Sequence, residues 1–150
     1  MLVHYYTQVN APIGGMVSAL EDIRVNLRAW GEWAYREGES LYARVGPDKG
    51  GIAKEVVLDI EPSVTRGDSV FYPVSWWATG ARMLFPRMQA DLILTPIGEG
   101  VTRLSFLGSY EPPLGALGHI LDRAVLGRVA DATVKAWVDR IASEMVPSLG

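Results

Sequence analysis

The fold is decided by the stretch VTRLSFLGSYEPPLG, residues 101–115, and by the sequence that follows it. Residues 101–110 have the composition and alternation of a strand with one buried face. Residues 111–115 form a rigid turn. One helical pattern then runs from about Leu117 to Met145, a length of roughly 40 Å. A long amphipathic helix that closes a chain of antiparallel strands favours a curved sheet wrapped around one helix, often with a cavity between them.

The strands expected before this stretch show similar patterns. Residues 2–9 and 53–60 predict two strands, and residues 70–79 predict a third, in which Pro73 indicates an edge position or a bulge. Residues 87–94 alternate apolar and polar side chains. The turn at residues 96–100 joins them to the last strand as an antiparallel hairpin. The expected inward face of that last strand consists of Thr102, Leu104, Phe106, Gly108 and Tyr110.

Two helices are expected between the first and second strands. Residues 13–20 predict a short helix after Pro12, and apolar residues recur with helical spacing from Ile23 to Val45. Gly31 and Gly38 weaken that second helix, so a break near either one is expected. Gly46-Pro47 ends it, residues 48–51 form a loop, and residues 66–68 form a turn. No repeat or linker is visible, and residues 1–150 are expected to form one domain.

Composition excludes several classes of function. The chain has a net charge of −3 and no run of basic residues, which argues against nucleic acid as the main partner. It has no cysteine, which excludes disulfides, thiolate zinc sites and cysteine nucleophiles. Two histidines predict no metal site, and no cofactor is expected. The sequence lacks a membrane-spanning stretch and a signal peptide, so we expect a cytoplasmic protein.

Three segments carry a resemblance to a known family. The first is residues 9–12, where the first strand meets the first helix. The others are residues 96–104, the hairpin into the last strand, and residues 108–115, which lead into the last helix. In this order they resemble the SRPBCC superfamily of START-like proteins, polyketide cyclases and pollen allergens. The resemblance implies an α+β helix-grip fold, with a curved antiparallel sheet of five to seven strands around a long C-terminal helix. Region 24–52 departs from other members, which favours five or six strands.

The resemblance also implies a deep apolar cavity between the sheet and the C-terminal helix, which in other members holds lipids, sterols, polyketides or other hydrophobic molecules. We expect its lining, and therefore the ligand-binding residues, to be Tyr5, Val56, Leu58, Tyr72, Trp76, Met88, Leu92, Leu104, Phe106, Leu121, Val125, Arg128 and Ala132. No catalytic residue is assigned.

Arg128 is the most informative charge in this set. Its spacing from Leu121 and Val125 places it on the predicted apolar stripe of the last helix, where a guanidinium would anchor the carboxylate or phosphate of an apolar ligand. The structural alternative is an arginine that reaches the cavity rim or pairs with Asp131 or Asp59.

Aromatic residues admit two interpretations as well. Trp76 and Trp77 point to opposite faces of their strand, so one indole faces inward and either lines a ligand cavity or packs as core. Tyr5, Tyr72 and Tyr110 either orient a polar group of a ligand or are core tyrosines with satisfied hydroxyls.

The remaining polar residues favour structural roles. His119 is expected in the first turn of the last helix, exposed and without an obvious partner, and His4 is expected at the surface. Glu55, Asp59 and Glu61 share the strand face opposite the apolar residues, which predicts a solvated cluster. The paired glycines at 14–15 and 50–51 lack the sequence of a phosphate loop, so nucleotide binding is excluded.

Three functions remain open. The first is a carrier or sensor that binds a hydrophobic small molecule or lipid in the cavity, as a monomer or homodimer. The second is an enzyme of the polyketide cyclase or dehydratase kind, which would use the same cavity with Arg128 and a tyrosine as polar groups. The third is a non-enzymatic interaction module whose interior is filled by side chains.

Overall fold

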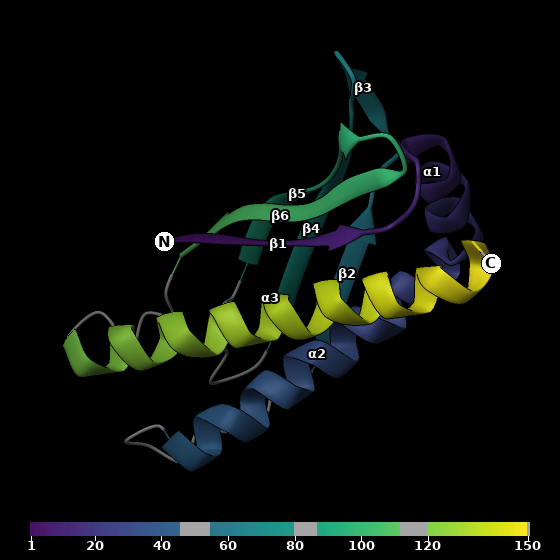
Figure 1. Cartoon of the computed structure of the whole chain (residues 1–150). Helices are drawn as coiled ribbons and strands as arrows, with labels where there is room; N and C mark the ends of the chain where they lie inside the picture. Colours follow the sequence, from purple (N-terminus) through teal and green to yellow (C-terminus); the bar gives the residue numbers. More distant parts are fainter. Residues whose placement is uncertain (46–54, 80–86, 112–119, 150) are drawn as a thin grey trace.

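The computed structural model describes residues 1–45, 55–79, 87–111 and 120–149, and Figure 1 shows their arrangement. The elements in chain order are β1 (Leu2–Val9), α1 (Ile13–Asp22), α2 (Arg24–Val45), β2 (Glu55–Ile60), β3 (Val64–Arg66), β4 (Ser69–Thr79), β5 (Arg87–Gly98), β6 (Val101–Tyr110) and α3 (Ile120–Leu149). The predicted features at Gly46-Pro47, in the loop at 48–51 and at 112–119 lie outside the described residues.

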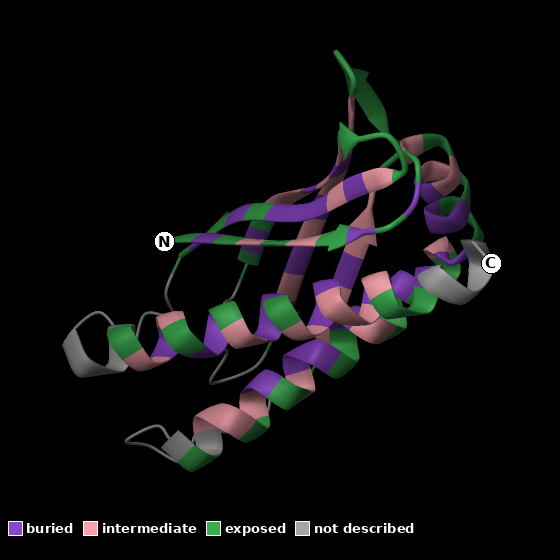
Figure 2. Ribbon diagram, viewed as in Figure 1, coloured by how far each residue is buried: buried purple, intermediate pink, exposed green. Residues whose placement is uncertain are grey.

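One antiparallel sheet holds all six described strands, in the order β1-β6-β5-β4-β2, with β3 paired to β4. The helices α2 and α3 run in opposite directions beneath one face of the sheet (Figure 1). Buried residues of both helices and of the strands form the core between these two layers (Figure 2). The expected α+β architecture, with the C-terminal helix packed on the sheet and two helices after the first strand, is confirmed.

The hairpin of β5 and β6 confirms the pattern that decides the fold. Its turn contains Gly100 at φ 72°, a backbone conformation that glycine adopts without strain. The register shifts between Pro96 and Gly98, so β5 continues four residues beyond the predicted Leu94. Every second residue of β6 from Thr102 to Tyr110 is buried, as the alternation predicted.

Pro73 lies inside the sheet, because β4 pairs with β5 on one side and with β2 and β3 on the other. The prediction that Pro73 lies on an edge strand is therefore wrong. The partners of β4 change at this point: β2 ends at Ile60, opposite Val74, and β3 starts at Val64, opposite Phe71. The missing N–H of Pro73 falls where the neighbouring strand is interrupted.

The two N-terminal helices separate at Ile23, whose N–H donates to the carbonyl of Ala19 at 3.2 Å. The expected break near Gly31 or Gly38 is wrong, because α2 is continuous through both. Gly31 instead allows α2 to approach β2. A Cβ atom at this position would lie 2.5 Å from Cδ1 of Leu58.

Helix α3 presents a different face to the core from the predicted one. Its buried residues are Leu126, Val129, Ala130, Thr133, Val134, Trp137, Val138, Ile141 and Met145. The predicted stripe through Val125 and Arg128 is wrong, because Val125 is only half-buried and Arg128 is exposed. The helix also continues past Met145, where its end was predicted, to Leu149. Among the described residues, no helix combines the length and hydropathy needed to cross a bilayer.

Candidate functional site

Three aromatic rings fill the centre of the interior between the sheet and α3. The ring centroids of Trp76 and Trp137 lie 5.4 Å apart, and the ring of Phe106 meets that of Trp137 edge-on at 5.9 Å. Nε1 of Trp137 donates to the carbonyl oxygen of Leu27 at 3.1 Å, which ties α3 to α2. Trp137, the central residue of this cluster, was not among the residues predicted from the sequence to line the interior.

Seven of the predicted lining residues have no more than 2% of their surface exposed: Leu58, Tyr72, Trp76, Met88, Leu92, Leu104 and Phe106. A side chain that lined an empty cavity would keep accessible surface, so in this conformation these seven pack as core. Tyr5, Val56, Val125 and Ala132 are half-buried, and the side chain of Leu121 lies outside the described part of the chain. Contact of these residues with a ligand stays a prediction.

Arg128 is exposed and does not continue the buried face of α3, because that face passes through its neighbour Val129. The predicted inward position of Arg128 is therefore wrong. Asp59, one of its suggested partners, pairs with Arg28 instead, at 2.7 Å. Asp131, the other, is exposed, and partial burial of its carboxyl raises its pKa.

A tyrosine with a carboxylate partner joins β1 to α3. The hydroxyl of Tyr5 donates to Oδ1 of Asp139 at 2.6 Å, and Nζ of Lys135 contacts Oδ2 of the same carboxylate at 2.7 Å. Burial, and then the bond to Asp139, raise the pKa of Tyr5, while Lys135 lowers it. The hydroxyl is therefore protonated and donates to Asp139, and this bond joins β1 to α3.

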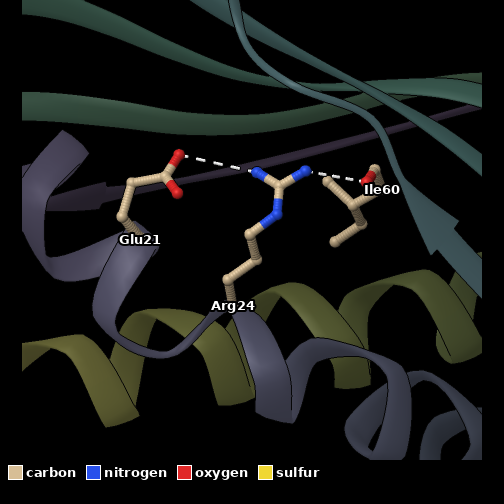
Figure 3. Close-up of polar contacts among 3 residues, drawn as sticks. All are labelled: Glu21, Arg24 and Ile60. Carbon is tan, nitrogen blue, oxygen red and sulfur yellow. Dashed lines mark hydrogen bonds and ion pairs between the residues drawn. The ribbon is translucent and has the colours of Figure 1, made fainter.

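A polar pocket of about 440 Å³ lies where α1 meets α2 beside the end of β2. Its lining consists of Glu21, Asp22, Arg24, Val25, Arg28 and Ile60. Figure 3 shows the guanidinium of Arg24 between the carboxylate of Glu21, at 3.5 Å, and the carbonyl oxygen of Ile60, at 2.7 Å. Two acids and two arginines balance in charge, and Val25 supplies an apolar wall.

The buried hydroxyl of Tyr72 lies near Glu21 and Arg24 of this pocket, and by geometry it has no hydrogen-bond partner among the described residues. The guanidinium carbon of Arg24 lies 6.0 Å from the centroid of the Tyr72 ring. Burial, with the negative charge of Glu21 as the second cause, raises the pKa of Tyr72 to about 12. Since burial disfavours the phenolate, the fold holds this tyrosine in its neutral form.

This pKa predicts a loss of stability at high pH. Tyrosine in the unfolded chain ionises near pH 10, whereas Tyr72 in the folded protein ionises near pH 12, so the unfolded state binds fewer protons between these values. The free energy of unfolding should therefore fall as pH rises from 10 to 12, by at most about 1.4 kcal/mol per pH unit. Denaturant unfolding of wild type and Tyr72→Phe at several pH values measures the difference. If the free energy of unfolding falls equally with pH in both proteins, Tyr72 does not have a raised pKa in the folded state.

The other predicted polar residues have mostly surface positions. His4 is exposed, as expected, and His119 lies outside the described residues. Glu55 and Glu61 are exposed and Asp59 is half-buried, consistent with a solvated strand face. In the part of the chain that the structure describes, no group of three or more His, Asp or Glu side chains is arranged to hold a metal ion.

Comparison with solved structures identifies the fold. A conserved protein from Geobacillus kaustophilus superposes with a TM-score of 0.54 at 16% identity, and 99% of this chain and 97% of that chain are covered. The ZhuI aromatase/cyclase from Streptomyces sp. R1128 superposes with a TM-score of 0.51 at 12% identity, with 97% and 93% covered. The chain therefore shares the helix-grip fold of these structures, in which one antiparallel sheet packs on a long C-terminal helix. No family model and no curated protein sequence matches the chain.

Within the helix-grip fold, this chain has six described strands and a 22-residue α2. The long helix occupies region 24–45, where the sequence predicted a departure from other members. Both α2 and α3 therefore pack beneath the sheet, and side chains from both helices close the centre of the interior.

Proposed function

We propose that the protein binds a hydrophobic small molecule or lipid between the sheet and the two long helices. The helix-grip fold supports this proposal, because it sets a concave apolar sheet face against α3. The aromatic centre is closed, so the ligand occupies one end of the interior.

The observation that carries the proposal is partial exposure of apolar residues at one end of the core. Leu41 and Tyr42 on α2, Val56 on β2 and Val125 on α3 pack against the core and remain half-buried. Because α2 and α3 run in opposite directions, the last turns of α2 and the first turns of α3 lie at the same end (Figure 1). Burial of ligand surface there supplies about 25 cal/mol per Å².

The polar groups of the described core favour binding over catalysis. Apart from tyrosines and tryptophans, the buried polar side chains of the described core are Thr102, Ser105 and Thr133. Thr102 donates to the carbonyl oxygen of Ala11 at 2.7 Å, and Thr133 donates to that of Val129 at 2.8 Å. These hydroxyls satisfy backbone groups, and Glu39, a carboxylate whose side chain is 10% exposed, is paired with Arg36 at 2.7 Å.

We expect Val125→Trp to weaken binding of a naphthalene-type fluorescent probe at least about tenfold, because the larger side chain fills the proposed space. Val64→Trp is the matched control, since Val64 is 45% exposed on β3, and should leave the probe affinity unchanged. Titration of the probe and its displacement by fatty acids give the affinities. If no apolar compound displaces the probe, the protein does not bind hydrophobic ligands in its interior. The alternative of an interaction module with a filled interior is then favoured.

A cyclase-like reaction is a second candidate, which Tyr5 favours because its hydroxyl has a carboxylate partner. Tyr5 lies on the same strand face as the buried Val3 and Val9. It would act on a substrate only after its bond to Asp139 opens. Turnover of a polyketide-like chain that is lost in Tyr5→Phe, with probe binding retained, would support this role. Absence of turnover in wild type leaves binding alone.

A further inference from the structure

We infer that α2 is a self-association surface, on which two copies of this chain pair antiparallel and each places Trp33 in the polar pocket of the other. The inference concerns the outer face of α2 and does not depend on ligand binding in the interior.

The outer face of α2 carries an apolar stripe. Val25 is 81% exposed, Trp33 is 40% exposed, and Ala29 between them is exposed as well. Residues four apart lie on one side of a helix, so the three form a line about 12 Å long. Tryptophan is a common anchor at protein interfaces, because its large indole combines apolar area with one hydrogen-bond donor.

The position of Trp33 is already constrained within one chain. The guanidinium carbon of Arg140, on α3, lies 4.7 Å from the centroid of the Trp33 ring and 5.2 Å from that of Trp30. This contact restrains the indole on the side of α3 and leaves the rest of the ring at the surface. A restrained side chain loses little conformational entropy on association.

The polar pocket lies two turns away on the same helix, and its walls include Val25 and Arg28. Its chemistry suits an indole. The carboxylates of Glu21 and Asp22 accept a hydrogen bond from the indole N–H, and the guanidinium groups of Arg24 and Arg28 suit the ring face. The apolar wall at Val25 covers the remaining edge.

A two-fold axis through Ala29 would bring Trp33 of each copy to the polar pocket of the other. Positions equally far from Ala29 along an antiparallel helix pair face each other, so Trp33 of one copy faces Val25 of the other, at the pocket. The same operation places Glu32 opposite Asn26, a carboxylate opposite an amide donor. Ala29 meets its own copy, and its small side chain permits close approach of the two helices. The partner that this face fits is therefore a second copy of the chain.

The test uses the position on the two-fold axis. We expect wild type to show a concentration-dependent monomer–dimer equilibrium by sedimentation between about 1 and 500 µM, and Trp33→Ala to weaken the dimer at least about tenfold. Ala29→Arg alone and Ala29→Glu alone should both be monomeric, because each places like charges together on the axis. An equimolar mixture of the two should form a heterodimer, because the opposite charges then meet.

Val64→Glu serves as the control at an exposed apolar position outside α2, and should associate as wild type does. Circular dichroism and thermal unfolding show that each variant is folded. A wild type that stays monomeric over the whole range overturns the proposal. Variants at Ala29 that associate as tightly as wild type, or that do not combine when mixed, overturn the two-fold axis proposed here.

Discussion

Replacing Trp137 with alanine is expected to lower the free energy of unfolding by about 4 kcal/mol, the upper range for large-to-small changes in a core. Trp137 is fully buried and packs against Trp76 and Phe106. Its removal leaves a cavity at the point where β4, β6 and α3 meet. It also removes the hydrogen bond to the carbonyl of Leu27 that joins α3 to α2. Denaturant unfolding at protein concentrations where the chain is monomeric gives the value.

Trp33→Ala is the matched control for this substitution, because it deletes the same side chain from a position that is 40% exposed. We expect it to cost less than about 1 kcal/mol in the monomer. Addition of indole should restore part of the stability of Trp137→Ala and leave Trp33→Ala unchanged, since an apolar cavity takes up an apolar molecule of matching shape. Similar losses in the two variants would mean that the aromatic centre does not hold the layers together.

Strand patterns were the most informative part of the sequence. A strand has a side-chain period of two, so Leu104 and Phe106 identify the buried face of β6 without reference to any other element. Pro73 was misjudged because the rule about proline in strands concerns the neighbouring strand, whose interruption between Ile60 and Val64 depends on tertiary structure. Local sequence predicts which residues share a face, but not where a partner strand ends.

The candidate site was harder to predict because α3 is apolar on more than one side. The predicted stripe followed Val125 and Arg128, whereas the buried face follows Leu126, Val129 and Trp137. The apolar area buried by tryptophan, leucine and valine exceeds that of alanine, so the larger side chains determine which face turns inward. Weighting each position by side-chain area would have found this face and excluded Arg128. The polar pocket could not be predicted in this way, because its lining comes from α1, α2 and β2, which only the tertiary structure brings together.

The second large effect is expected at Gly31, where alanine should lower the free energy of unfolding by about 2 kcal/mol. Alanine normally stabilises the interior of a helix by about 1 kcal/mol relative to glycine. At Gly31, however, the added Cβ would lie 2.5 Å from Cδ1 of Leu58 and 3.2 Å from its Cβ. Leu58 is 2% exposed, so its side chain can withdraw only by displacing neighbouring core residues. Crowding therefore outweighs the helical preference, and unfolding by denaturant should show a loss.

Gly127→Ala provides a control of opposite sign, because among the described residues a Cβ in this position of α3 meets only Cε of Met1, at an ordinary 3.4 Å. We expect Gly127→Ala to raise the free energy of unfolding by up to about 1 kcal/mol. The cause at Gly31 can be isolated by combining Gly31→Ala with Leu58→Ala, since the second change removes the crowding atoms. In that background Gly31→Ala should become neutral or stabilising, which gives a coupling energy of about 2 kcal/mol or more. If Gly31→Ala still lowers the free energy of unfolding by about 2 kcal/mol in the Leu58→Ala background, contact with Leu58 is not the cause of the loss.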